Sequence, residues 1–141
     1  MRTPLNKESF LEFPLHDADC LGVSITASPD DGRVALYLKV VTNEQEGFWG
    51  PRKSRHVTLE FEDCRRIIPN ILGTNVHREV ISTWEIITDS PLVEDLKQKG
   101  FDKAVKNQTH FALQFSWGSR IDVLAKGVIL ADGDDPAAKP D

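Results

Sequence analysis

The sequence predicts an α+β fold: a single antiparallel, strongly twisted β-sheet of about six strands with one short helix. Apolar and polar residues alternate in six stretches, and this period of two places successive side chains on opposite faces of a sheet. One further stretch, from Ser90 to Gly100, carries the start and stop signals of a helix. A chain of 141 residues with 40% hydrophobic content can bury one core, so we expect a single globular domain over residues 1–131.

The first two strands form the clearest local feature of the sequence. Residues 20–27 and 33–40 both alternate, and residues 28–32 between them are turn formers, which indicates a hairpin. The apolar members of the two alternations are Leu21, Val23, Ile25, Ala27, Val34, Leu36, Leu38 and Val40.

The third and fourth strands differ in their patterns. Residues 56–62 place Val57, Leu59 and Phe61 on one face and polar residues on the other, which predicts one core face and one solvent face. Residues 80–88 carry large apolar residues on both faces, which predicts a central strand. Between these strands, Pro69 lacks a backbone N–H group, so we expect a short turn over residues 64–72 that ends at Gly73.

The predicted helix is followed by a closing hairpin and a tail. Ser90 is suited to cap the helix, Pro91 to its first position and Gly100 to its end. Residues 111–117 and 121–125 alternate on either side of Gly118, whose freedom to adopt a positive φ suits a tight turn. Residues 132–141 have no apolar periodicity, and we expect a disordered acidic tail there.

Charge and cysteine content exclude several classes of function. The net charge of −5 disfavours binding to nucleic acid. No window approaches the roughly 20 apolar residues of a membrane span, and the N-terminus lacks the apolar core of a secretion signal, so we expect a cytoplasmic protein without membrane contact. Cys20 and Cys64 lack metal-binding or redox spacing and are interpreted as buried small hydrophobic residues. No cofactor or metal is expected.

Histidine offers few catalytic candidates. His16 precedes Asp17 and Asp19, and such a group could bind a metal or act as an oriented general base. In the simpler interpretation, which we favour, Asp17 turns the backbone and His16 hydrogen-bonds locally. His56 and His110 fall on outward positions of their strands, where solvated polar residues are expected.

Motifs for catalysis are missing from the sequence. It contains no GxSxG, GxxxxGK[ST] or GxGxxG motif, so neither a serine hydrolase nor a nucleotide enzyme is predicted, and no catalytic residue is assigned.

The most unusual stretch is residues 43–55. Phe48 and Trp49 lie between glycines and are followed by Arg52, Lys53 and Arg55. Aromatic and arginine side chains dominate the energetics of protein interfaces, so these five residues are a candidate partner-binding loop. The alternative is that Phe48 and Trp49 fold back to cover one end of the core.

The order of these features resembles a known group of small bacterial domains. Residues 13–19, with His16, Asp17 and Ala18 ahead of the first strand, together with residues 57–64 and 115–119, resemble immunity protein family 50 of polymorphic toxin systems over about residues 13–131. The resemblance implies an α+β domain that binds and neutralises a cognate toxin without catalysis. An acidic protein is compatible with a basic toxin, because opposite fields speed encounter.

The sequence therefore predicts a non-catalytic protein-binding domain, either a monomer or a homodimer. The alternative is a small enzyme or ligand-binding protein with its site around His16, Asp17 and Asp19.

Overall fold

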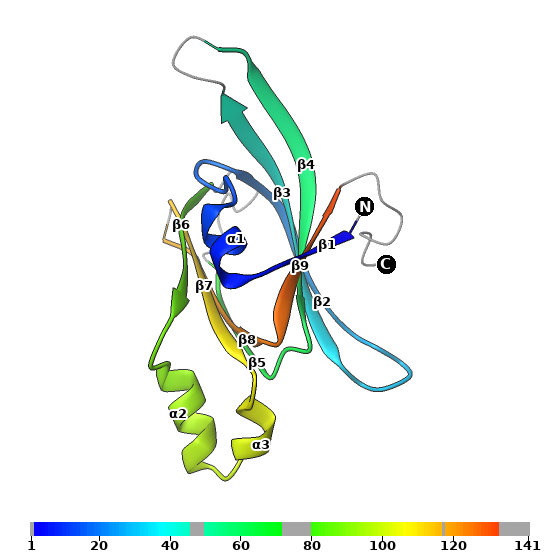
Figure 1. The fold of residues 1–141 in the computed structure, drawn as a ribbon, viewed down its shortest axis with the longest axis vertical. Coiled ribbons are helices and arrows are strands. Elements are labelled where there is room, and N and C mark those ends of the chain that lie inside the picture. Colours follow the sequence, from blue (N-terminus) through cyan, green and yellow to red (C-terminus); the bar gives the residue numbers. More distant parts are fainter. Residues whose placement is uncertain (1, 46–49, 72–79, 117, 133–141) are drawn as a thin grey trace.

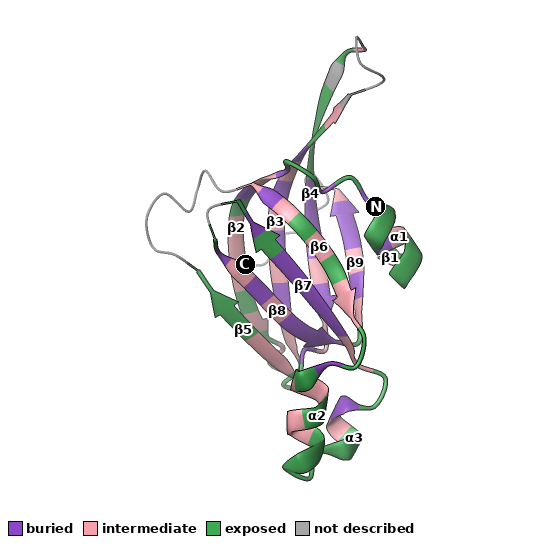
Figure 2. Cartoon of the chain, turned by 90° about the vertical axis from the view of Figure 1, so that its left-hand side faces the viewer, coloured by how far each residue is buried: buried purple, intermediate pink, exposed green. Residues whose placement is uncertain are grey.

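The computed structural model describes residues 2–45, 50–71, 80–116 and 118–132, which form two antiparallel sheets packed face to face (Figures 1 and 2). The five-stranded sheet has the order β1 (Arg2–Leu5), β9 (Gly127–Asp132), β4 (Arg52–Glu62), β3 (Val34–Gln45) and β2 (Asp19–Ala27). The four-stranded sheet has the order β5 (Arg66–Asn70), β8 (Arg120–Ala125), β7 (Thr109–Phe115) and β6 (Ile81–Ile87). A mainly β, antiparallel fold is confirmed, but the expectation of a single six-stranded sheet is wrong.

The core lies between the two sheets. Val57, Leu59 and Phe61 of β4 are buried, as their alternation predicts. Phe111 on β7 faces them from the other sheet, and its ring centroid lies 5.2 Å from that of Phe61 in an edge-to-face contact.

Helix α1 (Lys7–Glu12), which the sequence did not predict, adds a third aromatic ring to this core. Asn6 caps the helix by accepting a 2.7 Å hydrogen bond from the Ser9 backbone N–H. Phe10 is completely buried, with ring centroids 5.1 Å from Phe111 and 6.2 Å from Phe61. The helix therefore contributes to the core of the sandwich.

The first hairpin is confirmed, with one irregularity. β2 and β3 pair antiparallel, and Gly32 in the connecting turn has a φ of 72°. A β-bulge between Cys20 and Gly22 inserts Leu21 as an extra residue. As a result Cys20 is buried while Leu21 is 52% exposed, so the regular alternation predicted for the first strand fails at its start.

Two predictions for the middle of the chain are wrong. The turn expected over residues 64–72 is instead strand β5, an edge strand that tolerates Pro69, while Gly73 lies outside the described residues. β6, predicted to be central, is also an edge strand. A bulge after Ile81 brings this residue to the core side with Trp84 and Ile86, while Ile87, which pairs with His110, lies on the outer face.

Helix α2 (Pro91–Gln98) is confirmed: Ser90 caps it, and Gly100 follows it with a φ of 87°. Because α1 and the short α3 (Asp102–Val105) are also present, the prediction of one helix is too low. α2 and α3 lie together at one end of the elongated molecule (Figures 1 and 2). No helix in the described ranges has the length and apolar character needed to cross a membrane.

The closing hairpin is confirmed by β7 and β8, which pair Phe111 with Val123 and Leu113 with Ile121. Residues 127–132 then form β9, a strand that the sequence did not predict. Asp132 pairs with Val57 and so belongs to the sheet, whereas the rest of the predicted tail, residues 133–141, lies outside the described residues.

Candidate functional site

Strands β3 and β4 continue beyond their neighbours as a two-stranded ribbon. β2 pairs with β3 only as far as Val41, and β9 pairs with β4 only as far as Val57. Beyond these points residues 42–45 pair with residues 52–55 alone, and no other described strand lies beside either of them. We call these eight residues the arm; it projects from the end of the molecule opposite α2 and α3 (Figure 1).

The arm carries the basic residues that the sequence singled out. Lys53 and Arg55 are exposed on β4, and the backbone of Arg52 pairs with that of Gln45. Arg55 Nη2 lies 2.7 Å from Asp132 Oδ1, an ion pair that connects the arm to the end of β9. Phe48 and Trp49, the other two residues predicted to bind a partner, lie outside the described residues.

The base of the arm contacts the loop that contains His16, Asp17 and Ala18. Asn43 Nδ2 donates a 3.1 Å hydrogen bond to the backbone carbonyl of Asp17. The structure thus brings the basic stretch and the His-Asp-Ala motif together, although sequence analysis treated them as separate sites.

The His-Asp-Ala motif forms a corner between the two sheets. The Asp17 N–H donates to the Ile81 carbonyl and the Ile81 N–H donates to the Ala18 carbonyl, each over 3.0 Å. Ala18 is fully buried, and Asp17 has a φ of 61°, in the left-handed region. The backbone of the motif therefore has a structural role, as the simpler interpretation predicts for Asp17.

The two polar side chains of the motif lie in solvent. Those of His16 and Asp17 are 70% and 67% exposed, with Nε2 and Oδ2 3.5 Å apart, and Asp19 begins β2. No three His, Cys, Asp or Glu side chains in the described ranges are arranged to hold a metal ion. Cavities of about 440, 440 and 520 Å³ are lined by residues other than these three. Within the described part of the chain, the convergence of polar groups that an enzyme site at His16 requires is not observed.

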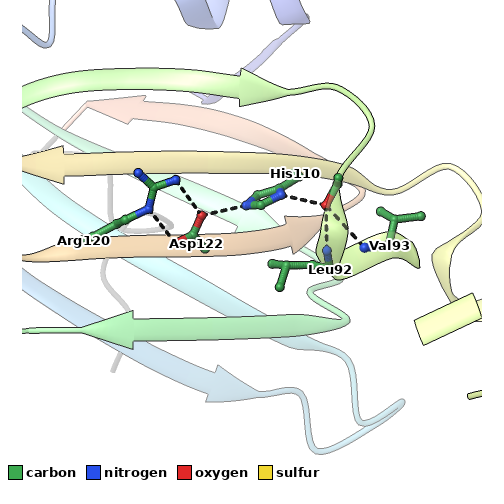
Figure 3. Close-up of polar contacts among 6 residues, drawn as sticks. Leu92, Val93, His110, Arg120 and Asp122 are labelled. Atoms are coloured by element: carbon green, nitrogen blue, oxygen red, sulfur yellow. Dashed lines mark hydrogen bonds and ion pairs between the residues drawn. The ribbon is translucent and has the colours of Figure 1, made fainter. Parts of the chain in front are cut away.

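A chain of polar contacts that the sequence did not reveal runs across the outer face of the four-stranded sheet (Figure 3). Ser90 Oγ lies 2.7 Å from His110 Nδ1, and His110 Nε2 lies 2.7 Å from Asp122 Oδ1. Arg120 Nε donates to Asp122 Oδ2 over 2.8 Å. His110 is only 4% exposed, so the prediction that it is solvated is wrong.

The contact between His110 and Asp122 could have been predicted from the sequence of the closing hairpin. His110 and Asp122 both fall on its outward phase, and the register that pairs Ala112 with Asp122 makes them diagonal neighbours. No local sequence pattern predicts the contact of Ser90 with His110. Ser90 reaches His110 because β6 and the start of α2 lie beside β7.

The direction of the hydrogen bonds decides what this chain of contacts does. Ser90 Oγ accepts from the N–H groups of Leu92 and Val93, at 3.2 and 3.3 Å. Both lone pairs of the hydroxyl are thereby engaged, so its proton is donated to His110 Nδ1, and Nε2–H is donated to Asp122.

Serine, histidine and aspartate are also the catalytic residues of serine hydrolases, but the hydrogen bonds that Ser90 makes here differ from those of a nucleophile. Ser90 Oγ is occupied by the helix cap, and the following residue, Pro91, has no N–H group to offer a developing oxyanion. We therefore interpret the contacts as an anchor that fixes the start of α2 to the sheet. Burial alone would raise the pKa of Asp122, but hydrogen bonds from Arg120 and His110 outweigh it and lower that pKa.

Comparisons of the chain with family models, with curated proteins and with solved structures find no match. Function is therefore inferred from the arm, from the corner at its base and from the anchored helix.

Proposed function

We propose that this protein is a non-catalytic protein-binding domain, of the toxin-immunity kind suggested by its His-Asp-Ala motif, and that the arm contacts the partner. The observation that carries the proposal is the projection of β3 and β4 beyond Val41 and Val57, where they have no neighbouring strand among the described residues.

The arm has properties that favour binding. A two-stranded ribbon alone in water is only marginally stable. Here the contacts of Asn43 with Asp17 and of Arg55 with Asp132 brace it from both strands. A braced projection loses less conformational entropy on binding than a mobile loop, and its backbone edges can accept a strand from a partner.

The charge of the arm specifies the chemistry of the surface that it meets. The arm holds Arg52, Lys53 and Arg55 and one acidic residue, Glu44, which lies opposite Lys53, so it is basic although the protein as a whole carries a charge of −5. Complementary fields orient partners during encounter. We propose that the partner presents acidic side chains to the arm, whatever its total charge.

The anchored helix supports a non-catalytic function. The nucleophile that the chain of contacts could have supplied, Ser90, is engaged in capping α2. The exposed side chains of His16 and Asp17 are instead available at the base of the arm to contact a partner.

Growth rescue tests the proposal. The protein is co-expressed with the toxin encoded beside its gene and compared with an arm-shortened variant in which residues 43–54 are replaced by Asn-Gly. Because Thr42 pairs with Arg55, a two-residue turn can close the shortened hairpin. We expect rescue by the wild type and none by the variant. Absence of rescue by the wild type, together with failure to capture any partner from the native host, would contradict the proposal.

A further inference from the structure

The two sheets of the sandwich have four outer edges, formed by β1, β2, β5 and β6. Natural proteins protect such edges with proline, with charged side chains or with a covering element, because an open edge accepts further strands. Three of the four are protected in this way. Pro4 lies within β1, Pro69 lies within β5, and α1 packs against β6, where Trp84 Nε1 donates to the Phe10 carbonyl over 3.1 Å.

Among the residues that the structure describes, β2 has none of these protections. From Cys20 to Ala27 it contains neither proline nor a charged residue. Asp19, its first residue, forms a bridge with Val80; beyond that point β3 is the one strand that pairs with β2 among the described residues. The bulge at Leu21 is confined to the start of the strand, and residues 22–27 pair with β3 in regular register.

The side chains of β2 are also unusually exposed for apolar residues. Leu21 is 52% exposed and Ile25 is 48% exposed. Ile25 and Val23 lie opposite Leu36 and Leu38 of β3, so both are on the core side of the sheet. The core face of the sandwich therefore continues to an edge where Ile25 remains half open to water.

We propose that β2 pairs antiparallel with β2 of a second copy, about a twofold axis at Ser24, and joins two five-stranded sheets. In this register Val23 lies opposite Ile25 of the second copy and Gly22 lies opposite Thr26. Ile25 is then covered by an apolar neighbour on its own face, and no charged side chain faces another within residues 22–26. This edge can accept an uncharged strand without proline, and β2 of a second copy is such a strand.

The proposed contact is separate from the arm. A single added strand buries less than the roughly 800 Å² per partner of a standard interface, so we expect a reversible dimer that forms as concentration rises. The arm-shortened variant retains β2 and should dimerise like the wild type. Loss of partner binding and loss of the dimer are thus independent outcomes.

Sedimentation velocity between about 10 μM and about 1 mM tests the proposal, with Ile25→Lys and Ile68→Lys as paired variants. Ile68 is 36% exposed on the proline-containing edge strand β5 and serves as the control. Half-exposed Ile25 can be replaced without opening the core. We expect the wild type and Ile68→Lys to dimerise with concentration and Ile25→Lys to associate at least about tenfold more weakly.

Amide hydrogen exchange supplies a second readout. The Ser28 N–H donates to the Arg33 carbonyl, and the Val34 carbonyl accepts from Cys64, which follows β4. By alternation the Val23 and Ile25 amides therefore point to the open edge of β2. Exchange of these two amides should slow as the concentration of the wild type is raised. A wild type that stays monomeric over the whole range, or an Ile25→Lys variant that dimerises unchanged, would overturn the proposal. A monomer that binds only a foreign extended peptide would overturn it as well.

Discussion

Asn43 donates from Nδ2 to the backbone carbonyl of Asp17 over 3.1 Å, and this contact fastens the base of the arm to the corner where the two sheets meet. Asp17 in turn holds the neighbouring sheet through its N–H bond to Ile81. The direction of the arm is therefore set by the body of the protein. A partner that binds the arm would also meet the exposed side chains of His16 and Asp17.

Replacement of Ser90 tests the anchor at the start of α2. Ser90→Ala removes the helix cap and leaves His110 Nδ1 without its donor, and we expect it to lower the free energy of unfolding by about 2 kcal/mol. Ser90→Thr keeps a hydroxyl in place and serves as the matched control. The measurement is urea unfolding; a loss below about 0.5 kcal/mol for the alanine variant would show that the contacts are not an anchor.

Asp122 makes the same anchor sensitive to acid. Burial raises its pKa, but hydrogen bonds from Arg120 and His110 outweigh burial, so the pKa in the folded protein lies below the ordinary 3.8. A lowered pKa stabilises the folded state above the pKa of the unfolded chain, and this contribution is lost as pH falls through the folded value. We expect Asp122→Asn to be less stable than the wild type near neutral pH, and the difference to shrink below about pH 4. A difference that grows in acid would contradict this assignment.

Elements that depend on sequence patterns a few residues long were predicted correctly. α2 was predictable because Ser90, Pro91 and Gly100 each act within one turn of the helix. The inward faces of residues 57–61 and of the closing hairpin were predictable because both strands are regular where they meet the core.

The division into two sheets depends on contacts between distant parts of the chain. β9 lies between β1 and β4, and its residue Ala131 pairs with Arg2, at the other end of the chain. Bulges at Leu21 and after Ile81 changed which side chains face inward, and alternation alone cannot locate such insertions.

The candidate site was predictable only in part. The unusual composition of residues 43–55 led to Lys53 and Arg55, which lie on the arm. The contact of Asn43 with Asp17 joins segments 26 residues apart through a backbone carbonyl, and a pattern of side-chain types does not encode such a contact. His110 was misinterpreted because an outward position on a strand can still be covered by a neighbouring segment.

The aromatic core can be tested through α1. Phe10→Ala removes a fully buried ring that contacts Phe61 and Phe111, and we expect it to cost about 3–5 kcal/mol of unfolding free energy. Leu11, the next residue, is 45% exposed, so Leu11→Ala should cost less than about 0.5 kcal/mol. Similar unfolding midpoints for the two variants would show that α1 is not part of the core.

The two cysteines, predicted to be buried, are buried thiols in the structure. Burial raises the pKa of the Cys64 thiol to about 11, so only about one in a thousand molecules carries the thiolate at pH 8. We expect Ellman's reagent to react slowly with the native protein and to detect both thiols in urea. Rapid reaction of one thiol in the native Cys20→Ala variant would contradict the burial of Cys64.

Binding of purified partner to the wild type, to Lys53→Glu and to the arm-shortened variant tests the central claim most directly. Lys126→Glu, an equal charge reversal at an exposed position outside the arm, is the control. We expect Lys53→Glu to weaken binding by about tenfold or more, the shortened arm to abolish it, and the control to bind like the wild type. An arm-shortened protein that is folded and binds the partner as tightly as the wild type would contradict the account.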